Sequence, residues 1–215
     1  MMPLMKLHFL NASGALTPLR PWLTRRLRAA HRRAAAVLEL PPLDVVIRAG
    51  NQVIPEKGHV GFAPAGGVIY ITVDPANPAL LADQHASLER MLAHELHHAA
   101  RWEAMAPGRS LGAALVAEGL AGQFVQQLYG PPREPWEALD TEALAPHLAA
   151  ARALWDSTDY DHPAWFFGTG ALPRWLGYTL GFQLVARHLA NHPDACAAGL
   201  VAAPDTAFRP LLDQI

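Results

Sequence analysis

The sequence predicts an α+β fold that is mainly α, with a small N-terminal sheet packed on a helical core. Two features support this expectation. Short runs rich in β-branched residues precede residue 75 and are typical of strands. From about residue 80, apolar residues recur at helical spacing. A chain of 215 residues with 51% hydrophobic content can bury a sizeable core, so we expect a single domain over residues 1–215.

Residues 1–40 are predicted to form an N-terminal strand or arm followed by an Arg-rich helix at 18–39. This helix holds six of the 17 basic residues of the chain. One interpretation is a surface for an anionic partner such as nucleic acid or membrane lipid. The other is a solvated helix that docks through its apolar side chains, which are Leu23, Leu27, Ala30 and Val37. The net charge of −2 favours the second interpretation and argues against nucleic acid as a partner.

Residues 43–75 are predicted to form the small sheet. The runs Val45-Val46-Ile47 and Val60-Gly61-Phe62 are short and apolar, and residues 68–73 form the strongest strand signal. Gly66-Gly67 stands just before that strand and indicates a tight hairpin turn.

A helix is predicted from about Asp83 to Ala104, inside a helical core with a metal site at 80–215. The apolar side chains that recur along it and should face the core are Leu88, Met91, Leu92 and Trp102. This helix also carries the most informative feature of the chain, the H-E-x-x-H run from His94 to His98. Residues four apart share a helix face, so His94 and His98 can bind one zinc ion together. Glu95 then lies where it can take a proton from metal-bound water.

A catalytic zinc site needs a third protein ligand, and Glu118 is the candidate. It follows His98 by twenty residues, in a second helix that Ser110 begins and Gly130 ends. Pro107-Gly108 ends the first helix. The small side chains expected to let these two helices approach closely are Ala117, Gly119, Ala121 and Gly122. The His-His-Glu set and its spacing resemble those of thermolysin and the gluzincin peptidases.

Different metal-ligand sets fit less well. A metzincin would need Gly at 101 and His at 104, where the chain has Arg101 and Ala104. His97 is the rival ligand, but only the pair at 94 and 98 leaves Glu95 in the position of the base. Glu103 is the rival acid, and we expect it on the surface. The remaining interpretation of the motif is an amphipathic helix with partly buried histidines.

The C-terminal half is predicted to be helical with one long loop. Residues 141–155 form a helix that Pro146 kinks or restarts. Residues 156–170 form an aromatic-rich loop long enough to act as a lid. Pro173 opens a further helix at 174–190, on which Gly177 and Gly181 permit close contact with a neighbouring helix.

The order of the motifs HELHH, EGLA at 118–121 and Gly-Tyr-x-x-Gly at 177–181 resembles a bacterial family of predicted zinc-dependent proteases. The resemblance covers about residues 40–190 and includes Val-Ile-Pro-Glu at 53–56 and Ile-x-x-Asp-Pro ending at Pro75. It implies a gluzincin-like peptidase whose core is of the zincin type. In peptidases of this kind an edge strand beside the metal binds the substrate as an added strand, and residues 67–73 are the candidate.

The mechanism that we expect is hydrolysis of a peptide or protein by zinc-bound water. Zn²⁺ binds His94, His98 and Glu118, while Glu95 moves the proton. A further donor must stabilise the oxyanion, and the catalytic candidates are Tyr178, His162 and Arg174. Arg174 has two more interpretations, which are binding of a substrate carboxylate and pairing with one of Asp156, Asp159 and Asp161.

One position departs from the thermolysin pattern, in which an Asp four residues after the ligand Glu orients a ligand histidine. Gly122 stands there, so the acceptor for that histidine must come from elsewhere. This departure is consistent with a metal-binding protein that has little hydrolytic activity. Two further functions are compatible with the sequence: hydrolysis of a non-peptide amide, and a non-enzymatic interaction module built on the Arg-rich helix.

The single Cys196 excludes an internal disulfide framework and suits a reducing compartment. No run of eighteen apolar residues is present, so we expect no transmembrane segment. The start of the chain does not have the pattern of a signal peptide. We therefore expect a cytoplasmic protein, with its oligomeric state left open.

Overall fold

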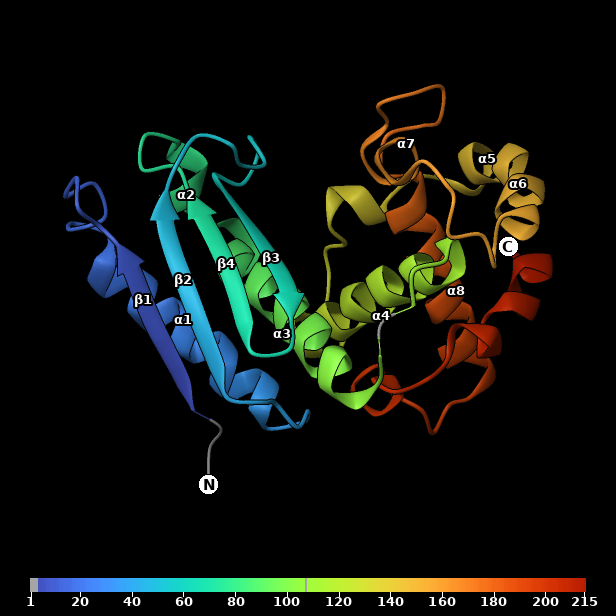
Figure 1. Cartoon of the computed structure of the whole chain (residues 1–215), viewed down its shortest axis with the longest axis horizontal. Coiled ribbons are helices and arrows are strands. Elements are labelled where there is room, and N and C mark those ends of the chain that lie inside the picture. Colours follow the sequence, from blue (N-terminus) through green and yellow to red (C-terminus); the bar gives the residue numbers. More distant parts are fainter. Residues whose placement is uncertain (1–3, 107) are drawn as a thin grey trace. The chain divides into compact units, whose positions relative to one another are not determined.

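The computed structural model describes residues 4–106 and 108–215, and its internal packing divides the chain into two units. One unit extends to Glu103 and the other begins at Ala104 (Figure 1). The first contains the sheet and the second is helical, so the α+β, mainly α class is confirmed. The single domain expected from the sequence stays a prediction.

The first unit is built on a four-stranded sheet in the order β1-β2-β4-β3. The strands are β1 (Met5–Leu10), β2 (Leu43–Ala49), β3 (His59–Ala65) and β4 (Val68–Val73). β1, β2 and β4 are parallel, and β3 joins β4 as an antiparallel edge strand. Parallel neighbours need a crossover, which α1 (Arg20–Ala35) supplies between β1 and β2.

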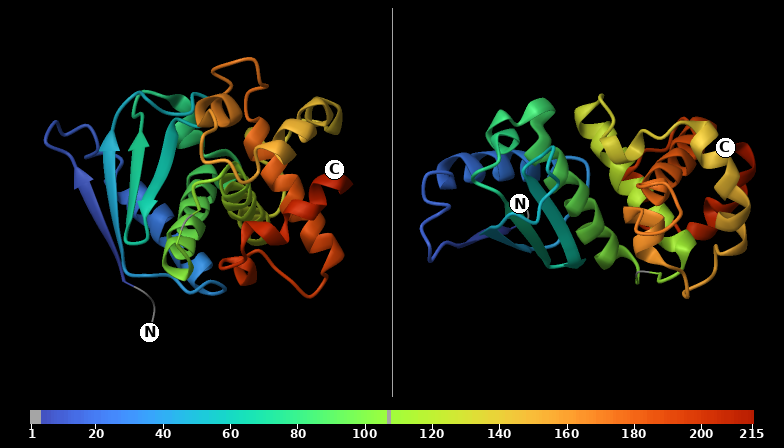
Figure 2. Two further views of the ribbon diagram at one scale, coloured as in Figure 1. Left: turned by 45° about the vertical axis from the view of Figure 1, so that its right-hand side comes forward. Right: turned by 90° about the horizontal axis from the view of Figure 1, so that it is seen from above.

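One face of the sheet is buried beneath α1 and α3 (Ser87–Ala104) (Figures 1 and 2). Alternate sheet residues point toward these helices and are fully buried, namely Val45, Ile47, Ile69, Ile71 and Val73. Leu23, Leu27 and Ala30 of α1 are also fully buried, which confirms their predicted docking role. The prediction for Val37 was wrong. It lies beyond the end of α1 and is 49% exposed.

The hairpin predicted at Gly66-Gly67 is present, because Ala65 pairs with Val68 across it. The prediction that residues 67–73 form a substrate-binding edge strand was wrong. β4 is flanked on both sides, by β2 and by β3, so its main-chain groups already serve the sheet. The free edge on this side of the sheet belongs to β3.

The motif helix α3 begins four residues later than predicted. Asp83 has a left-handed backbone with φ of 41°, and its carboxylate instead accepts a hydrogen bond from the backbone N–H of Leu88 at 2.9 Å. The short helices α2 (Pro78–Ala82) and η1 (Gln84–Ala86) precede it. The helix ends at Ala104, and Pro107, the predicted stop, lies outside the described residues.

Side-chain contacts hold the start of α3 in place. Arg26 of α1 pairs with Asp83 at 3.0 Å and with Glu89 at 2.9 Å. One arginine of the Arg-rich helix therefore serves the fold itself. Trp102, near the other end of α3, is 39% exposed, so its predicted place in the core was wrong.

The second unit is centred on two helices, α4 (Leu111–Tyr129) and α8 (Leu176–Asn191). The predicted cap of α4 is confirmed, because Ser110 Oγ accepts from the backbone N–H of Ala113 at 3.2 Å and Gly130 follows the helix with φ of 67°. The shorter elements are η2 (Pro135–Glu137), α5 (Thr141–Leu144), η3 (Ala145–His147), α6 (Leu148–Ala153), α7 (His162–Phe167), η4 (Ala198–Leu200), η5 (Asp205–Ala207) and η6 (Arg209–Gln214).

Two glycines allow α4 and α8 to touch. A Cβ atom on Gly119 would lie 2.1 Å from the carbonyl oxygen of Gly181, and one on Gly181 would lie 2.0 Å from that of Leu115. The close contact predicted for Gly181 is therefore confirmed. Gly119 thus lies against α8, and its predicted role between the two metal-binding helices stays a prediction.

Two predictions about the C-terminal half were also wrong. Residues 156–170 are not one loop, because Asp161 caps α7 by accepting from the backbone N–H of Ala164 at 2.9 Å. Arg174 lies outside α8, because Trp175 has φ of 70° and helical geometry begins at Leu176. The break predicted at Pro146 is confirmed by the change from α5 to η3 to α6. Within the part of the chain that the structure describes, no helix combines the length and apolar character of a membrane span.

Replacing Gly181 with Ala is expected to destabilise the protein by about 1–3 kcal/mol, because the new methyl group must displace a backbone carbonyl rather than a flexible side chain. Chemical denaturation measures the change. Gly199→Ala is the matched control, since its nearest neighbour, Cys196 Sγ, would be 3.6 Å away. Equal stability of the two variants would contradict the close packing of α4 on α8.

Candidate metal centre

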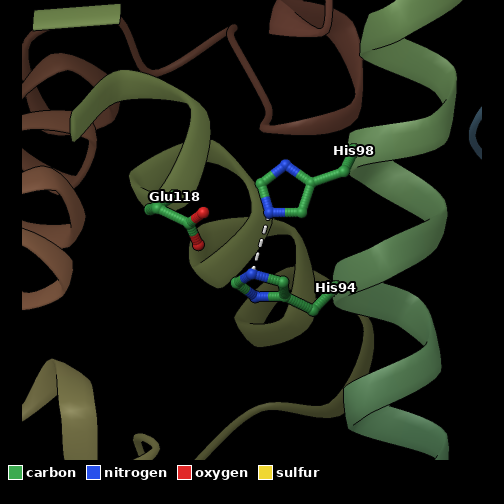
Figure 3. A group of neighbouring side chains, drawn as sticks. All are labelled: His94, His98 and Glu118. Atoms are coloured by element: carbon green, nitrogen blue, oxygen red, sulfur yellow. Dashed lines mark hydrogen bonds between the residues drawn. The ribbon is translucent and has the colours of Figure 1, made fainter. Parts of the chain in front are cut away.

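His94 and His98 lie one turn apart on α3, and both are half-buried. Their Nε2 atoms are 3.0 Å apart, and the rings meet edge to face with centroids 4.7 Å apart (Figure 3). Two nitrogen ligands of a tetrahedral zinc ion with bonds of 2.0–2.1 Å would be roughly 3.3 Å apart. The two imidazoles thus already stand close to the separation that a shared metal ion requires.

Glu118 lies on α4 and is half-buried. One ligand atom from each of His94, His98 and Glu118 lies within 4.8 Å of the others (Figure 3). Two imidazole nitrogens and a carboxylate oxygen form a donor set that zinc accepts, with a fourth position left for water or substrate. The chemistry of these donors therefore fits zinc.

Glu95 is only 8% exposed and lies against β3. A Cβ atom on Gly61 would be 2.6 Å from Glu95 Cγ, 3.0 Å from its Oε1 and 2.5 Å from Met91 Sδ. Only glycine leaves room for the carboxylate to pass under this strand. Sequence reasoning did not single out Gly61, although an isolated glycine in a short strand is typical of a close approach of this kind.

The two rival side chains lie elsewhere. His97 is completely buried, which suits a core position. Glu103 is exposed, as predicted, and its carboxylate lies against Gly66 of the β3–β4 turn.

His162 lies beside Glu118 in an aromatic cluster within the second unit. Its Nδ1 is 3.0 Å from the hydroxyl of Tyr160, and its ring stacks on Phe166 with centroids 4.4 Å apart. Partial burial lowers the pKa of His162, and the charge of Glu118 raises it by a smaller amount. Burial, assisted by the same charge, raises the pKa of Tyr160. Sequence reasoning missed Tyr160, which carries no motif signal of its own.

The charge of Glu118 can be detected at His162. In zinc-free protein we expect the imidazole to titrate below 6.5 and Glu118→Gln to lower its pKa further, since that change removes the raising contribution. NMR titration of the ring protons measures both. The depressed pKa also means that the contribution of His162 to stability is lost as pH falls through its folded-state pKa. A pKa that rises in Glu118→Gln would contradict this account.

The two remaining catalytic candidates, Tyr178 and Arg174, follow this cluster in the sequence. Tyr178 of α8 is half-buried, and its ring meets Phe166 edge to face at 5.2 Å between centroids. Arg174 is exposed and lies 4.1 Å from the centroid of the Trp175 ring. Asp156, one of the acids proposed to pair with Arg174, instead forms an ion pair with Arg209 at 2.8 Å.

A buried carboxylate stands beside Gly122, where the thermolysin pattern has an Asp. A Cβ atom at Gly122 would be 2.5 Å from Oε1 of Glu137. Glu137 is 2% exposed, and its second carboxylate oxygen accepts from the backbone N–H of Glu134 at 3.1 Å. A side chain at 122 would therefore collide with Glu137, which explains why the residue is glycine. The carboxylate on this side of α4 is that of Glu137.

An H-E-x-x-H helix, with an additional Glu whose ligand atom lies near both histidines, defines a candidate zinc site with two histidines and one glutamate as ligands. The chain belongs to the family described as Predicted Zn-dependent protease (DUF2268), whose model matches residues 23–208. The resemblance deduced from the motifs is thereby confirmed.

Two curated relatives come from Bacillus subtilis (strain 168) and are both named as uncharacterized proteins. YjfC is 25% identical over 158 residues, which cover 66% of this chain and 51% of YjfC. YjaZ is 27% identical over 139 residues, which cover 59% of this chain and 51% of YjaZ. The chain thus spans about half the length of the curated relatives it matches. No solved structure gives a significant match.

Proposed function

We propose that this chain is a zinc-dependent metallopeptidase of the gluzincin type, with His94, His98 and Glu118 as the metal ligands and Glu95 as the general base. The observation that carries the proposal is the convergence of three ligand atoms within 4.8 Å beside a helix whose Glu95 adjoins the first histidine. The family description supports zinc dependence and proteolysis as its class of function.

Zinc bound by these ligands would supply Lewis-acid chemistry, lowering the pKa of a water in its open position toward neutrality. Glu95 accepts a proton from the attacking water and delivers it to the leaving amine. Its low exposure and the close contact with Gly61 restrict the carboxylate to a small region, so the proton is held at a defined place.

Negative charge on the carbonyl oxygen needs a donor in addition to the metal. We assign this role to the cluster that contains His162 and Tyr178, and Arg174, which lies against Gly168 at the end of α7, is a further candidate. The hydroxyl of Tyr160 can donate to Nδ1 of His162, and this would fix the ring as the tautomer that carries its proton on Nε2. His162 would then present an N–H donor while remaining neutral.

β3 replaces residues 67–73 as the strand that binds the substrate main chain. It is the edge strand beside β4, and it lies against Glu95 at Gly61. An extended peptide added to this edge would run past the catalytic base. The substrate is therefore proposed to be a peptide or an extended segment of a protein.

Gly61→Ala is expected to lower kcat about a hundredfold, because the added methyl group would overlap Met91 and the side chain of Glu95. Zinc content should not change, since the ligands are untouched. Gly67→Ala is the matched control, with its nearest neighbour 3.9 Å from the new methyl group. Full activity in a folded Gly61→Ala variant would show that the position of Glu95 against β3 is irrelevant to catalysis.

Metal removal tests the function as a whole. Zinc-loaded protein is expected to cleave members of a random peptide library, a chelator should stop cleavage, and one equivalent of zinc should restore it. Mass spectrometry of the products measures this. Cleavage that persists after complete removal of the metal would contradict the proposal.

A further inference from the structure

We propose that the outer edge of β3 binds a peptide main chain at one residue, Gly61, and that the enzyme therefore acts on short extended segments. This inference rests on the proposed peptidase function and specifies its substrate class. It follows from what occupies the edge on either side of Gly61.

The edge is closed at His59. The backbone carbonyl of His59 accepts a hydrogen bond at 3.3 Å from the backbone N–H of Ile54, which pairs with it as an isolated antiparallel bridge. His59 also pairs with Val73 of β4, so it has a neighbour on each side within the sheet. A substrate strand cannot extend past this point without displacing the turn that contains Ile54.

The edge is closed again at Ala63. The indole Nε1–H of Trp102 donates to the carbonyl oxygen of Ala63 at 3.2 Å. The next residue is Pro64, which has no backbone N–H to offer. The pairing with β4 also shifts register between Phe62 and Ala65. The regular part of the edge therefore ends here.

The alternation of a strand decides which residues face outward. The carbonyl of Gly58, just before β3, accepts from the backbone N–H of Asp74 at 2.9 Å and so faces β4, while the N–H of Gly58 donates to the carbonyl of Ile54. Successive residues turn their main-chain groups to opposite sides, so Val60 and Phe62 also face β4. His59, Gly61 and Ala63 face the outer edge, in agreement with the bonds from Ile54 and Trp102.

Gly61 is thus the residue between the two closures whose outward N–H and C=O can both pair with a substrate. An antiparallel partner opposite Gly61 would exchange two hydrogen bonds with it. Gly61 is also the residue that lies directly against Glu95. The open position of the edge therefore coincides with the proposed general base, and it accommodates about three residues of extended chain.

The test uses zinc-loaded protein and pools of random peptides, blocked at both ends, of fixed lengths from three to ten residues. Cleavage is measured by mass spectrometry as a rate for each peptide bond. We expect the rate to increase up to about five residues, which are the three that the edge accommodates and one more at either end, and then to stay within about twofold. A rate that continues to increase up to ten residues would overturn the proposal.

Trp102→Phe is the informative variant, because it removes the indole N–H and keeps an aromatic ring. Freeing the carbonyl of Ala63 should increase cleavage of pools of six or more residues about fivefold, the value of one hydrogen bond, and leave shorter pools unchanged. Trp22→Phe, the same change on α1, should alter the cleavage rate of neither the longer nor the shorter pools. An unchanged length profile in Trp102→Phe would overturn the proposal, because the indole would then not be what closes the edge at Ala63.

If no pool is cleaved, the proposed function alone is contradicted. Binding of a peptide at Gly61 can then still be measured by amide hydrogen exchange. Zinc-loaded Glu95→Gln protein is mixed with the five-residue pool. Protection of the backbone N–H that increases at Gly61, without an increase at Ala63, supports binding of the peptide main chain at Gly61 alone. No added protection at Gly61, or protection at both residues, overturns it.

Discussion

Glu95→Gln is expected to abolish peptide hydrolysis and to leave zinc binding unchanged. Glutamine has nearly the size of glutamate and keeps one side-chain oxygen as an acceptor, but its neutral amide cannot accept the proton of the attacking water. Loss of a general base lowers kcat by about 10²–10⁴-fold. Because Glu95 is only 8% exposed and packed against Gly61, a shape-conserving change should leave the fold intact. Cleavage rates and elemental analysis of the same sample measure both effects.

Glu103→Gln is the matched control for that experiment. It changes an acid on the same helix that is exposed and lies against the β3–β4 turn, so it should retain full activity and zinc. A folded, zinc-loaded Glu95→Gln protein that keeps more than about a tenth of the activity would remove Glu95 from its assigned role.

Glu118→Ala is expected to weaken zinc binding by about a hundredfold or more, since loss of an outer-shell partner alone costs 10–100-fold. Two histidines from one helix would then be the protein ligands that remain. Competition with a chelator of known affinity measures the dissociation constant. His98→Ala should have an effect of the same order, because it removes a ligand from the histidine-bearing helix.

Glu142→Ala is the control for Glu118→Ala, since Glu142 is an exposed acid of the short helix α5. Unchanged zinc affinity in Glu118→Ala would mean that another carboxylate completes the site. Glu137, buried beside Gly122, would then be the first to substitute.

The elements with strong local signals could be predicted from the sequence. The β-branched run at 68–73, the turn at Gly66-Gly67 and the cap at Ser110 all appear as expected, because each depends on interactions within a few residues. The two histidine candidates were found for the same reason, since the spacing of His94 and His98 alone determines that they share a helix face. Glu118 was found instead through the resemblance of its spacing to that of the gluzincins.

Features that depend on the tertiary structure could not be predicted. Strand order is one such feature: the strongest strand signal, β4, lies inside the sheet, while the weaker β3 forms its edge. The importance of Gly61 and Tyr160 is another such feature. Their importance arises from neighbours more than thirty residues away in the chain, Glu95 for the first and Glu118 for the second, and no short pattern records such pairs.

Left-handed backbone conformations explain two boundary errors. Asp83 and Trp175 were expected inside or beside continuous helix, yet both have positive φ and lie before the helix proper. Neither is glycine, so composition gave no indication of it. The exposure of Trp102 has a different origin, because its indole donates a hydrogen bond to the edge strand and does not fill the core.

Elemental analysis of purified, tag-free protein tests the central claim most directly. After zinc is supplied and free metal is dialysed away, we expect one zinc per chain in the wild type and loss of that zinc in His94→Ala and Glu118→Ala. A wild-type protein that retains no metal under these conditions would contradict the zinc peptidase account and leave H-E-x-x-H as part of a structural helix.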